Sequence, residues 1–327
     1  MRFSRCCFFT ALGIGALLNG CRRDTEVVVL KLAHGLNTSH PVHQAMEFMA
    51  QRLSRKSAGR ARIDIYPSEQ LGSERECLEL LQIGSLAMTK VSSSVLEAFV
   101  PEQKVLSLPY IFRDDEHRFS VLGGQIGKRL LRAGEKVWLR GLCYYDAGSR
   151  SFYTKEKPIR APQDLVGLKI RTQESPTSME MVQSLGGSPT PIAWGELYTS
   201  LQQGVVDGAE NNAPSFYLSH HYEVCKYYSL DEHTAVPDVL VISTRIWNSL
   251  TPEFQRLLQE AANESAQHQR KLWTAATRQA LAAVEAAGVQ VIYPDKILFA
   301  EQVEPLYETY RTDAVIYHLI QEIKRSR

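Results

Sequence analysis

The sequence Val-Val-Val-Leu-Lys-Leu-Ala occupies residues 27–33, and Gly-Leu-Asn-Thr-Ser-His-Pro follows it at residues 35–41. The first run is apolar and rich in β-branched side chains, which is typical of a buried strand, and the second run has turn composition. A helical pattern of apolar residues then extends from Val42 to about Lys56. This stretch therefore predicts a strand, a turn and a helix in succession.

The same alternation of strand and helix patterns continues along the chain. Ala61–Tyr66 alternates apolar and polar residues as a strand does, and the turn-forming segment Pro67–Gly72 follows it. The next elements that we expect are a helix at Glu74–Ile83, a strand at Met88–Val91, a helix at Glu116–Ala133 and a strand at Val137–Tyr145. Alternation of this kind is typical of a parallel, doubly wound sheet, so the predicted fold class is α/β.

A second block of α/β sequence begins near Gly148. We expect strands at Leu168–Arg171 and Val205–Gly208, with helices around Pro176–Leu185 and Trp194–Gln203. A chain of 327 residues exceeds the usual size of one core, which favours two lobes. Asp238–Thr244 has strong strand character and follows Pro237, so we expect the chain to return to the first block there. The sequence therefore predicts a two-lobed periplasmic-binding-protein fold with a hinge, with lobe I at 27–147 and 237–276 and lobe II at 148–236 and 277–327.

One long helix is expected near the end of the chain. Thr251-Pro252-Glu253 supplies an N-cap, a proline in the first turn and an acidic residue, and Gly288 supplies the stop. About 36 residues at 1.5 Å each give about 54 Å, which is longer than one lobe is wide. We expect this helix to span both lobes.

The N-terminal residues have the pattern of an export signal. Arg2 and Arg5 precede an uncharged, mostly apolar run, which at about 13 residues is short for a membrane span. Residues 1–20 are therefore predicted to be a signal peptide, and residues 21–26 a tether. Leu-Asn-Gly-Cys at residues 18–21 resembles a lipobox whose Cys21 is acylated, although cleavage near Gly20 with an incidental cysteine is the alternative. Both possibilities predict a periplasmic protein.

Charge and cysteine content limit the possible functions. The chain has 37 basic and 36 acidic residues, without a long run of either sign, so no nucleic-acid surface is expected. Cys77, Cys143 and Cys225 lie beyond the signal and cannot all pair with one another. We interpret them as buried small side chains, while a Cys143–Cys225 disulfide remains open.

Common catalytic, cofactor and metal motifs are absent from the sequence. It has no Gly-x-Ser-x-Gly, P-loop, His-Glu-x-x-His, Cys-x-x-Cys or Gly-x-Gly-x-x-Gly pattern. The histidines at positions 34, 40, 43, 220 and 221 do not have zinc-site spacing with further partners. We therefore expect a binding protein, with no cofactor and no bound metal, and no enzyme.

Arg171 is the first candidate site residue. It ends the predicted strand Leu168–Arg171, and ligands bind at the carboxyl ends of strands in open α/β sheets. A guanidinium offers a fixed fork of donors that matches a carboxylate. From its position alone, a surface or inter-element ion pair is the more favoured interpretation.

A longer pattern strengthens this assignment. It comprises Asp-Leu-Val-Gly-Leu-Lys-Ile-Arg at 164–171, Leu-Gly-Gly-Ser-Pro-Thr-Pro at 185–191, and Trp194 to Asn211 with the motif Asp-Gly-Ala-Glu-Asn. Together with Tyr-Pro-Ser-Glu-Gln-Leu-Gly at 66–72, Leu-Pro-Tyr at 108–110 and Tyr-Glu-Val-Cys-Lys-Tyr at 222–227, it resembles the TRAP-transporter solute-binding proteins of the DctP family. The resemblance spans nearly the whole chain beyond the signal.

The resemblance implies roles for particular residues. Arg171 matches the family's carboxylate-binding arginine, and Arg150, in Gly-Ser-Arg, matches a second arginine that often contributes to the same anion. Asn211 matches the amide beside the carboxylate, with Asn212 as its neighbouring competitor. Trp194 matches an aromatic that packs on the ligand's carbon skeleton, with a place in the lobe core as the alternative.

Four further residues are weaker candidates. Glu74 occupies a position where the family often has an acidic ligand contact, although it also suits a helix N-terminus. His34 and Ser92 fall near the ends of predicted strands, and Glu174 either contacts the ligand or pairs with Arg171.

These residues suggest a monocarboxylate with several hydroxyls, such as the sugar acids glucuronate and galacturonate. A dicarboxylate or keto acid in the same fold is the alternative, because the residues alone do not fix the anion. The resemblance implies membrane permease subunits as partners, with the membrane contacted only through a possible lipid anchor. The rival functions are an ABC-type binding protein, a sensor subunit, and a periplasmic sugar-acid enzyme with Glu74 or Glu210 as its base.

Overall fold

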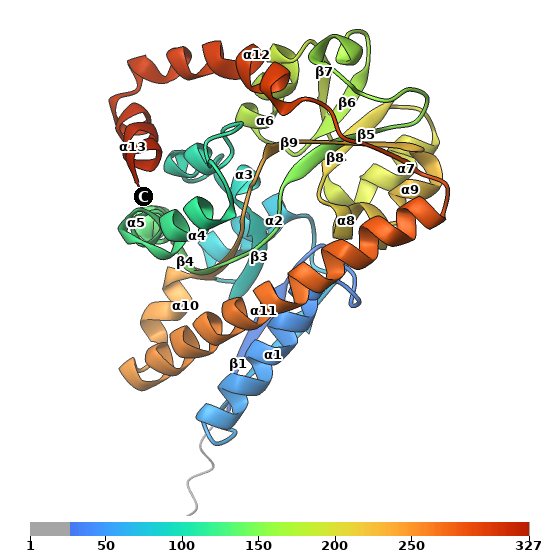
Figure 1. Cartoon of the computed structure of the whole chain (residues 1–327). Coiled ribbons are helices and arrows are strands. Elements are labelled where there is room, and N and C mark those ends of the chain that lie inside the picture. The colour runs from blue at the N-terminus through green and yellow to red at the C-terminus, as the bar shows by residue number, and fades with distance from the viewer. Residues whose placement is uncertain (1–26, 327) are drawn as a thin grey trace, which may run out of the picture.

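The computed structural model describes residues 27–326. The predicted signal peptide at 1–20, the lipobox cysteine Cys21 and the tether at 21–26 lie outside the described residues. Two mixed sheets form separate lobes, and helices cover them (Figure 1). The predicted α/β two-lobed fold class is confirmed.

The first sheet has five strands in the order β2-β1-β3-β10-β4. These strands are β1 (Val28–Ala33), β2 (Ala61–Tyr66), β3 (Met88–Ser92), β4 (Leu139–Tyr145) and β10 (Asp238–Ser243). The interior strand β10, between β3 and β4, is buried at every residue and runs antiparallel to both of its neighbours. The return of the chain at Asp238–Thr244 was therefore predicted correctly, but the prediction of an all-parallel sheet was wrong.

The second sheet has six strands in the order β11-β9-β5-β8-β6-β7. They are β5 (Arg150–Thr154), β6 (Lys169–Thr172), β7 (Ser188–Pro191), β8 (Gly208–Asn211), β9 (Tyr227–Thr234) and β11 (Gln290–Ile292). The strand predicted at Val205–Gly208 begins three residues later, because Val205 is exposed and the chain pairs with β5 only from Gly208. This shift places Glu210 and Asn211 within the sheet.

The predicted helices are present in the predicted order, one of them is divided, and several further helices were not predicted. They are α1 (Pro41–Lys56), α2 (Glu74–Ile83), α3 (Ser93–Leu96), α4 (Asp115–Gly123), α5 (Gln125–Ala133), α6 (Pro176–Ser184), α7 (Leu197–Gln202), α8 (Ala213–Leu218), α9 (His221–Val224), α10 (Thr244–Ser249), α11 (Pro252–Ala286), α12 (Lys296–Thr309) and α13 (Ala314–Arg325). The single helix predicted at Glu116–Ala133 is two helices, because Gly124 has an extended backbone between them.

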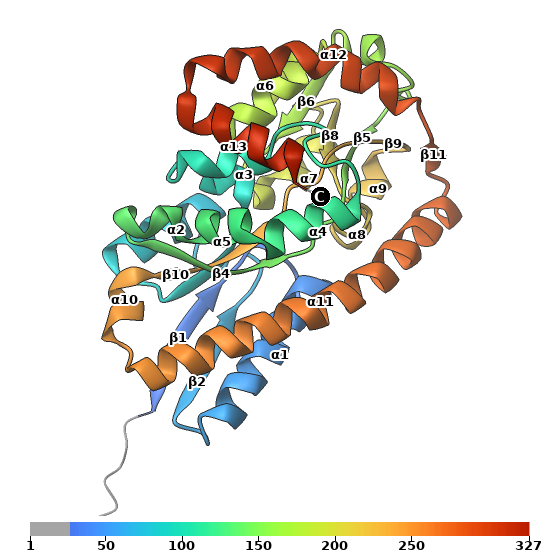
Figure 2. The same cartoon turned by 60° about the vertical axis from the view of Figure 1, so that its left-hand side comes forward.

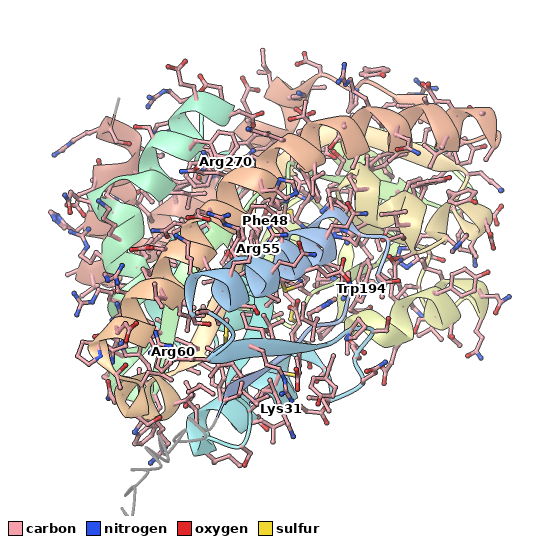
Figure 3. All side chains as sticks on the ribbon, turned by 90° about the horizontal axis from the view of Figure 1, so that it is seen from below. Lys31, Phe48, Arg55, Arg60, Trp194 and Arg270 are labelled. Carbon is pink, nitrogen blue, oxygen red and sulfur yellow. The ribbon has the colours of Figure 1, made fainter. Side chains whose placement is uncertain are left out.

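The long helix α11 contains 35 residues, and the Thr251 hydroxyl caps it by accepting a hydrogen bond from the Phe254 N–H. It packs against α1 and β4 of the first lobe and against α8 of the second lobe (Figure 2). Phe48, labelled on α1 in Figure 3, faces α11. Its ring stacks on His268 of α11, with ring centroids 4.3 Å apart. At about 52 Å, α11 braces both lobes as predicted.

The lobes are also joined through their cores. One buried apolar cluster contains Val91 and Val239 of the first sheet together with Phe152 and Ile170 of the second. The C-terminal helix α13 packs against α5, whereas α12 packs against α6 and β9. We keep the lobe boundaries given above as a proposal, with one change. Those boundaries place α13 in lobe II, but α13 packs against α5 of lobe I.

The cysteines agree with the simpler of their two interpretations. Cys77, Cys143 and Cys225 are free and buried, so the Cys143–Cys225 disulfide is not formed in this structure. Within residues 27–326, no helix combines the length and apolar character that a membrane crossing requires.

Candidate ligand-binding site

A cavity with about 690 Å³ of empty space, which includes its mouth, lies between the two sheets. Seven of the eight predicted ligand-binding residues line it, namely Glu74, Ser92, Arg150, Arg171, Glu174, Trp194 and Asn211. The two lobes both contribute, because Glu74 and Ser92 belong to the first lobe and the other five belong to the second.

Arg171 on β6 is buried but has no acidic partner. Its Nε donates to the Ile192 carbonyl at 2.8 Å, which fixes the plane of the guanidinium. Its buried Nη1 has no hydrogen-bond partner, and no carboxylate within residues 27–326 lies within 4.0 Å of it. Burial lowers the pKa of Arg171, and the nearby Arg150 lowers it further. A buried cation in this condition is costly unless an anion joins it, so this arginine is suited to bind a carboxylate.

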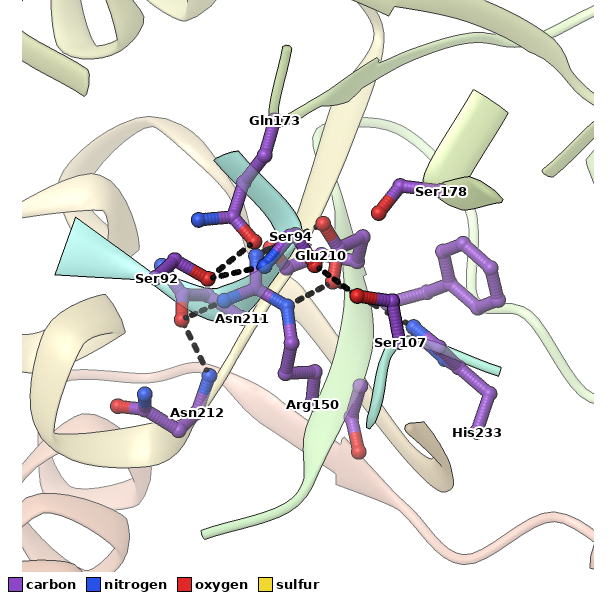
Figure 4. A network of polar contacts seen from close by, with 12 residues as sticks. Ser92, Ser94, Ser107, Arg150, Gln173, Ser178, Glu210, Asn211, Asn212 and His233 are labelled. Carbon is purple, nitrogen blue, oxygen red and sulfur yellow. Dashed lines mark hydrogen bonds and ion pairs between the residues drawn. The ribbon is translucent and has the colours of Figure 1, made fainter. Parts of the chain in front are cut away.

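Arg150 on β5, by contrast, is fully paired. Its guanidinium forms an ion pair with Glu210 on β8, and Nη2 donates to Glu210 Oε1 at 2.7 Å (Figure 4). Nη1 donates to Asn211 Oδ1 at 3.0 Å, and the same oxygen accepts from the Asn212 N–H at 2.9 Å. The Asn211 carbonyl oxygen is thus occupied, while its amide NH₂ makes no hydrogen bond to another described residue and can donate to a ligand.

A buried charge network supports Arg150 from behind. His233 Nδ1 lies 2.7 Å from Asp231 Oδ2, and its Nε2 lies 3.5 Å from Glu210 Oε2. Burial opposes the charged ring, but the two carboxylates raise the pKa of His233 to about 9. Burial also opposes the charge of Glu210, yet Arg150 and His233 lower the pKa of Glu210 to about 2. Each charge in this network has a partner of opposite sign.

The first-lobe wall carries a second set of paired charges. Lys90 on β3 donates through Nζ to Glu74 Oε1 at 2.8 Å and to Asp238 Oδ1 at 3.3 Å. Glu74 Oε2 also accepts from the Ser92 N–H at 3.1 Å. Burial opposes the charge of Lys90, but Asp238 and Glu74 raise its pKa well above the usual value. Glu74 therefore does more than stabilise the N-terminus of α2, because its carboxylate lines the cavity and pairs with Lys90 there.

Hydrogen bonds cross from one lobe to the other around the cavity. Ser92 Oγ donates to Gln173 Oε1 at 3.2 Å, and the Gly195 N–H donates to Glu69 Oε1 at 3.2 Å. Asn37 Nδ2 donates to the Leu218 carbonyl at 2.9 Å. These contacts hold the lobes closed over the cavity.

Aromatic rings form part of the cavity lining. The Trp194 ring centroid lies 5.8 Å from Arg171 Cζ, and this indole packs on apolar residues of both lobes. Trp273 on α11 lines the cavity beside His40, whose ring centroid is 5.8 Å away. These rings offer apolar surface to the carbon skeleton of a ligand.

Two predicted residues have less direct positions. His34 does not line the cavity, since its Nε2 hydrogen-bonds to His43 Nδ1 at 2.9 Å and its Nδ1 accepts from the Leu36 N–H at 3.1 Å. Burial lowers the pKa of His34 to about 2, so its ring is neutral. Glu174 lines the cavity without an ion pair to Arg171, which leaves its ligand role as a prediction.

Comparison with known proteins supports the assignment of the family. The DctP family, described as bacterial extracellular solute-binding protein family 7, matches residues 32–313. The chain belongs to this family. The protein YiiZ of Salmonella typhimurium is 38% identical over 301 residues, which are 91% of this chain and 92% of YiiZ.

Solved structures of TRAP solute-binding proteins have the same fold. A protein from Xanthobacter autotrophicus Py2 with bound β-D-galacturonate is 40% identical, with a TM-score of 0.88, and the match covers 91% of this chain and all of that one. A protein from Roseobacter denitrificans with bound β-D-glucuronate is 36% identical, with a TM-score of 0.89 and the same coverage. The TRAP resemblance inferred from the sequence is confirmed.

This chain is therefore a TRAP-type extracytoplasmic solute-binding protein, a class that binds small organic anions and works with membrane permease subunits. Sequence reasoning did not identify several residues that line the solute-binding cavity, namely His40, Lys90, Gln173, Asp238 and Trp273. Gln173 lies two residues after Arg171, which was a usable signal. Lys90 and Asp238 carried none, because their pairing joins strands 148 residues apart.

Proposed function

We propose that this solute-binding protein captures a hexuronate, such as D-galacturonate or D-glucuronate, between its lobes. Arg171 carries the proposal, because it is a buried guanidinium with a free donor at the cavity between the lobes, and no carboxylate of residues 27–326 pairs with it. The proteins with bound galacturonate and glucuronate are 40% and 36% identical to it, which supports the same ligand class here.

The remaining lining suits a sugar acid better than an apolar acid. Glu74 and Asp238 offer carboxylate oxygens to ring hydroxyls, and the Asn211 amide offers a donor. Trp194 and Trp273 provide apolar surface for the sugar's C–H groups. Ligand contacts from both lobes favour the closed form, and that form would dock on the permease.

We propose further that the ligand leaves unchanged. An enzyme using Glu210 as its base is disfavoured, because the ion pair with Arg150 and the proximity of His233 lower the pKa of Glu210 to about 2 despite its burial. A carboxylate of such low basicity removes protons poorly near neutral pH. Glu74, the other candidate base, hydrogen-bonds to Lys90 and Ser92.

A thermal-shift screen of residues 22–327 tests the ligand class. The panel contains D-galacturonate, D-glucuronate, succinate, pyruvate and an uncharged sugar, each at high concentration. A ligand at 100 times its Kd stabilises the folded protein by about 2.7 kcal/mol. Stabilisation by the hexuronates, with the ligand recovered intact by NMR, is the expected result. Stabilisation by succinate alone, or chemical conversion of the hexuronate, would contradict the proposal.

We also propose a periplasmic location with an acylated Cys21 as anchor, supported by the lipobox-like sequence at residues 18–21. Mass spectrometry of the N-terminal peptide from the native host tests it. Acylation is expected on Cys21, and the Cys21→Ala variant should move from the membrane fraction to the soluble periplasm. A free, unacylated N-terminus after cleavage near Gly20 would exclude the anchor.

A further inference from the structure

Three cationic side chains line the cavity, but their charges are not equally available. Arg150 is paired with Glu210, and Lys90 is paired with both Glu74 and Asp238. Arg171 alone of these three lacks a carboxylate partner within the described part of the chain. The cavity therefore offers one position at which a carboxylate can meet an uncompensated positive charge.

The first-lobe wall has an excess of negative charge. Lys90 contributes +1, while Glu74 and Asp238 contribute −1 each, which gives a sum of −1. Two of the three Lys90 N–H donors are used by these carboxylates, and Asp238 Oδ2 accepts no hydrogen bond from another described residue. One free ammonium donor and several free carboxylate lone pairs are groups that sugar hydroxyls can satisfy.

We propose that Lys90, Glu74 and Asp238 form a hydroxyl-binding subsite that rejects a second carboxylate, and that Asp238 is the specificity-determining residue. The cavity then accepts monocarboxylate sugar acids and excludes the matching aldarates, which carry a carboxylate at both ends. This inference rests on the proposed hexuronate function and narrows its substrate class. A second carboxylate placed on this wall would face like charge in a closed, poorly solvated space.

Lys90 is the only cation of this three-residue subsite, so it is the residue to which a second ligand carboxylate would bind. Its side chain is almost completely buried, and its two acidic partners already outnumber it. An added carboxylate would have to share the ammonium with both of them. Removal of one partner by Asp238→Asn reduces the wall's charge from −1 to 0 without a change in side-chain size.

Calorimetric titrations with galacturonate, galactonate and galactarate test the proposal. Galactonate and galactarate are both open chains and differ at one end, where a hydroxymethyl replaces a carboxylate, so their comparison isolates charge from ring shape. Burial raises the pKa of Asp238, an effect that the neighbouring Lys90 opposes, so the titrations are run at about pH 8 to favour the ionised carboxylate. The wild-type protein is expected to bind galactarate at least about tenfold more weakly than galactonate.

Asp238→Asn is expected to reduce the ratio of the galactarate Kd to the galactonate Kd by about tenfold. Asp64→Asn, the same change at a half-buried aspartate outside the cavity that is also ion-paired, should leave the ratio unchanged. If Asp238→Asn does not fold, Glu74→Gln carries the same prediction. Equal wild-type affinity for both open-chain acids, or a ratio unmoved in both cavity variants, would overturn the inference and leave the proposed function standing. Absence of galacturonate binding would overturn both.

Discussion

Replacement of Arg171 by lysine tests the carboxylate site with the least disturbance. The Nε donor is used by the Ile192 carbonyl, so Nη1 and Nη2 remain for the ligand. Lysine keeps the positive charge but cannot present two parallel donors to one carboxylate. Loss of one charge-assisted hydrogen bond costs about 1.5–3 kcal/mol, which corresponds to about 10- to 150-fold in Kd.

Titration calorimetry with D-galacturonate measures this change, and circular dichroism verifies the fold of the variant. Arg160→Lys is the matched control, because Arg160 is an exposed arginine of the same lobe outside the cavity. We expect the control to bind as the wild-type protein does. A change in Kd of less than about threefold for Arg171→Lys would refute the assignment of a bidentate contact.

Three further predictions follow from the same structure. Gly148 lies between the lobes with φ +57°, and a Cβ there would lie 2.9 Å from Trp273 Nε1. Gly148→Ala should therefore raise the Kd for galacturonate by about fivefold or more. Gly59→Ala is the control and should bind normally, because Gly59 has φ +80° but a Cβ there would have no neighbour within 4 Å. Trp194→Phe should reduce the ligand-induced change in tryptophan emission without abolishing it, since Trp194 lies beside the proposed carboxylate site and Trp273 also lines the cavity, and an unchanged fluorescence response would place the ligand away from Trp194. Asp231 and Glu210 raise the pKa of His233 from 6.5 to about 9 despite its burial, so the stability that His233 contributes is complete below pH 6.5 and is lost as the pH rises through 9. Between pH 6.5 and 9 the Tm of the wild-type protein should therefore fall more steeply than the Tm of His233→Gln. Parallel Tm curves would contradict this assignment.

The backbone elements were predicted well where the signal was local. The run at residues 27–33 forms β1 at Val28–Ala33, although it is only partly buried because Val27 and Val29 are exposed, and Thr251 caps α11 as predicted. The direction of β10 was not predictable in this way. Its antiparallel pairing with β3 and β4 depends on where the chain returns, and no local pattern encodes that path.

The candidate site shows the same division. Arg171 was proposed first from its position at the end of a predicted strand and then, more strongly, from the family resemblance, and the structure places it at the cavity. His34 also follows a strand, yet its ring hydrogen-bonds to His43 away from the cavity, and strand position does not fix the direction of a side chain. The paired states of Arg150 and Lys90 depend on contacts between distant strands, so their available charge became visible only in the structure.

A crystal structure of the protein grown with D-galacturonate would test the central claim most directly. The ligand is predicted to occupy the cavity between the two lobes, with its carboxylate within hydrogen-bond distance of Arg171 Nη1 and its hydroxyls against Glu74 and Asp238. A galacturonate carboxylate bound at Lys90, or a ligand outside the cavity, would contradict the account.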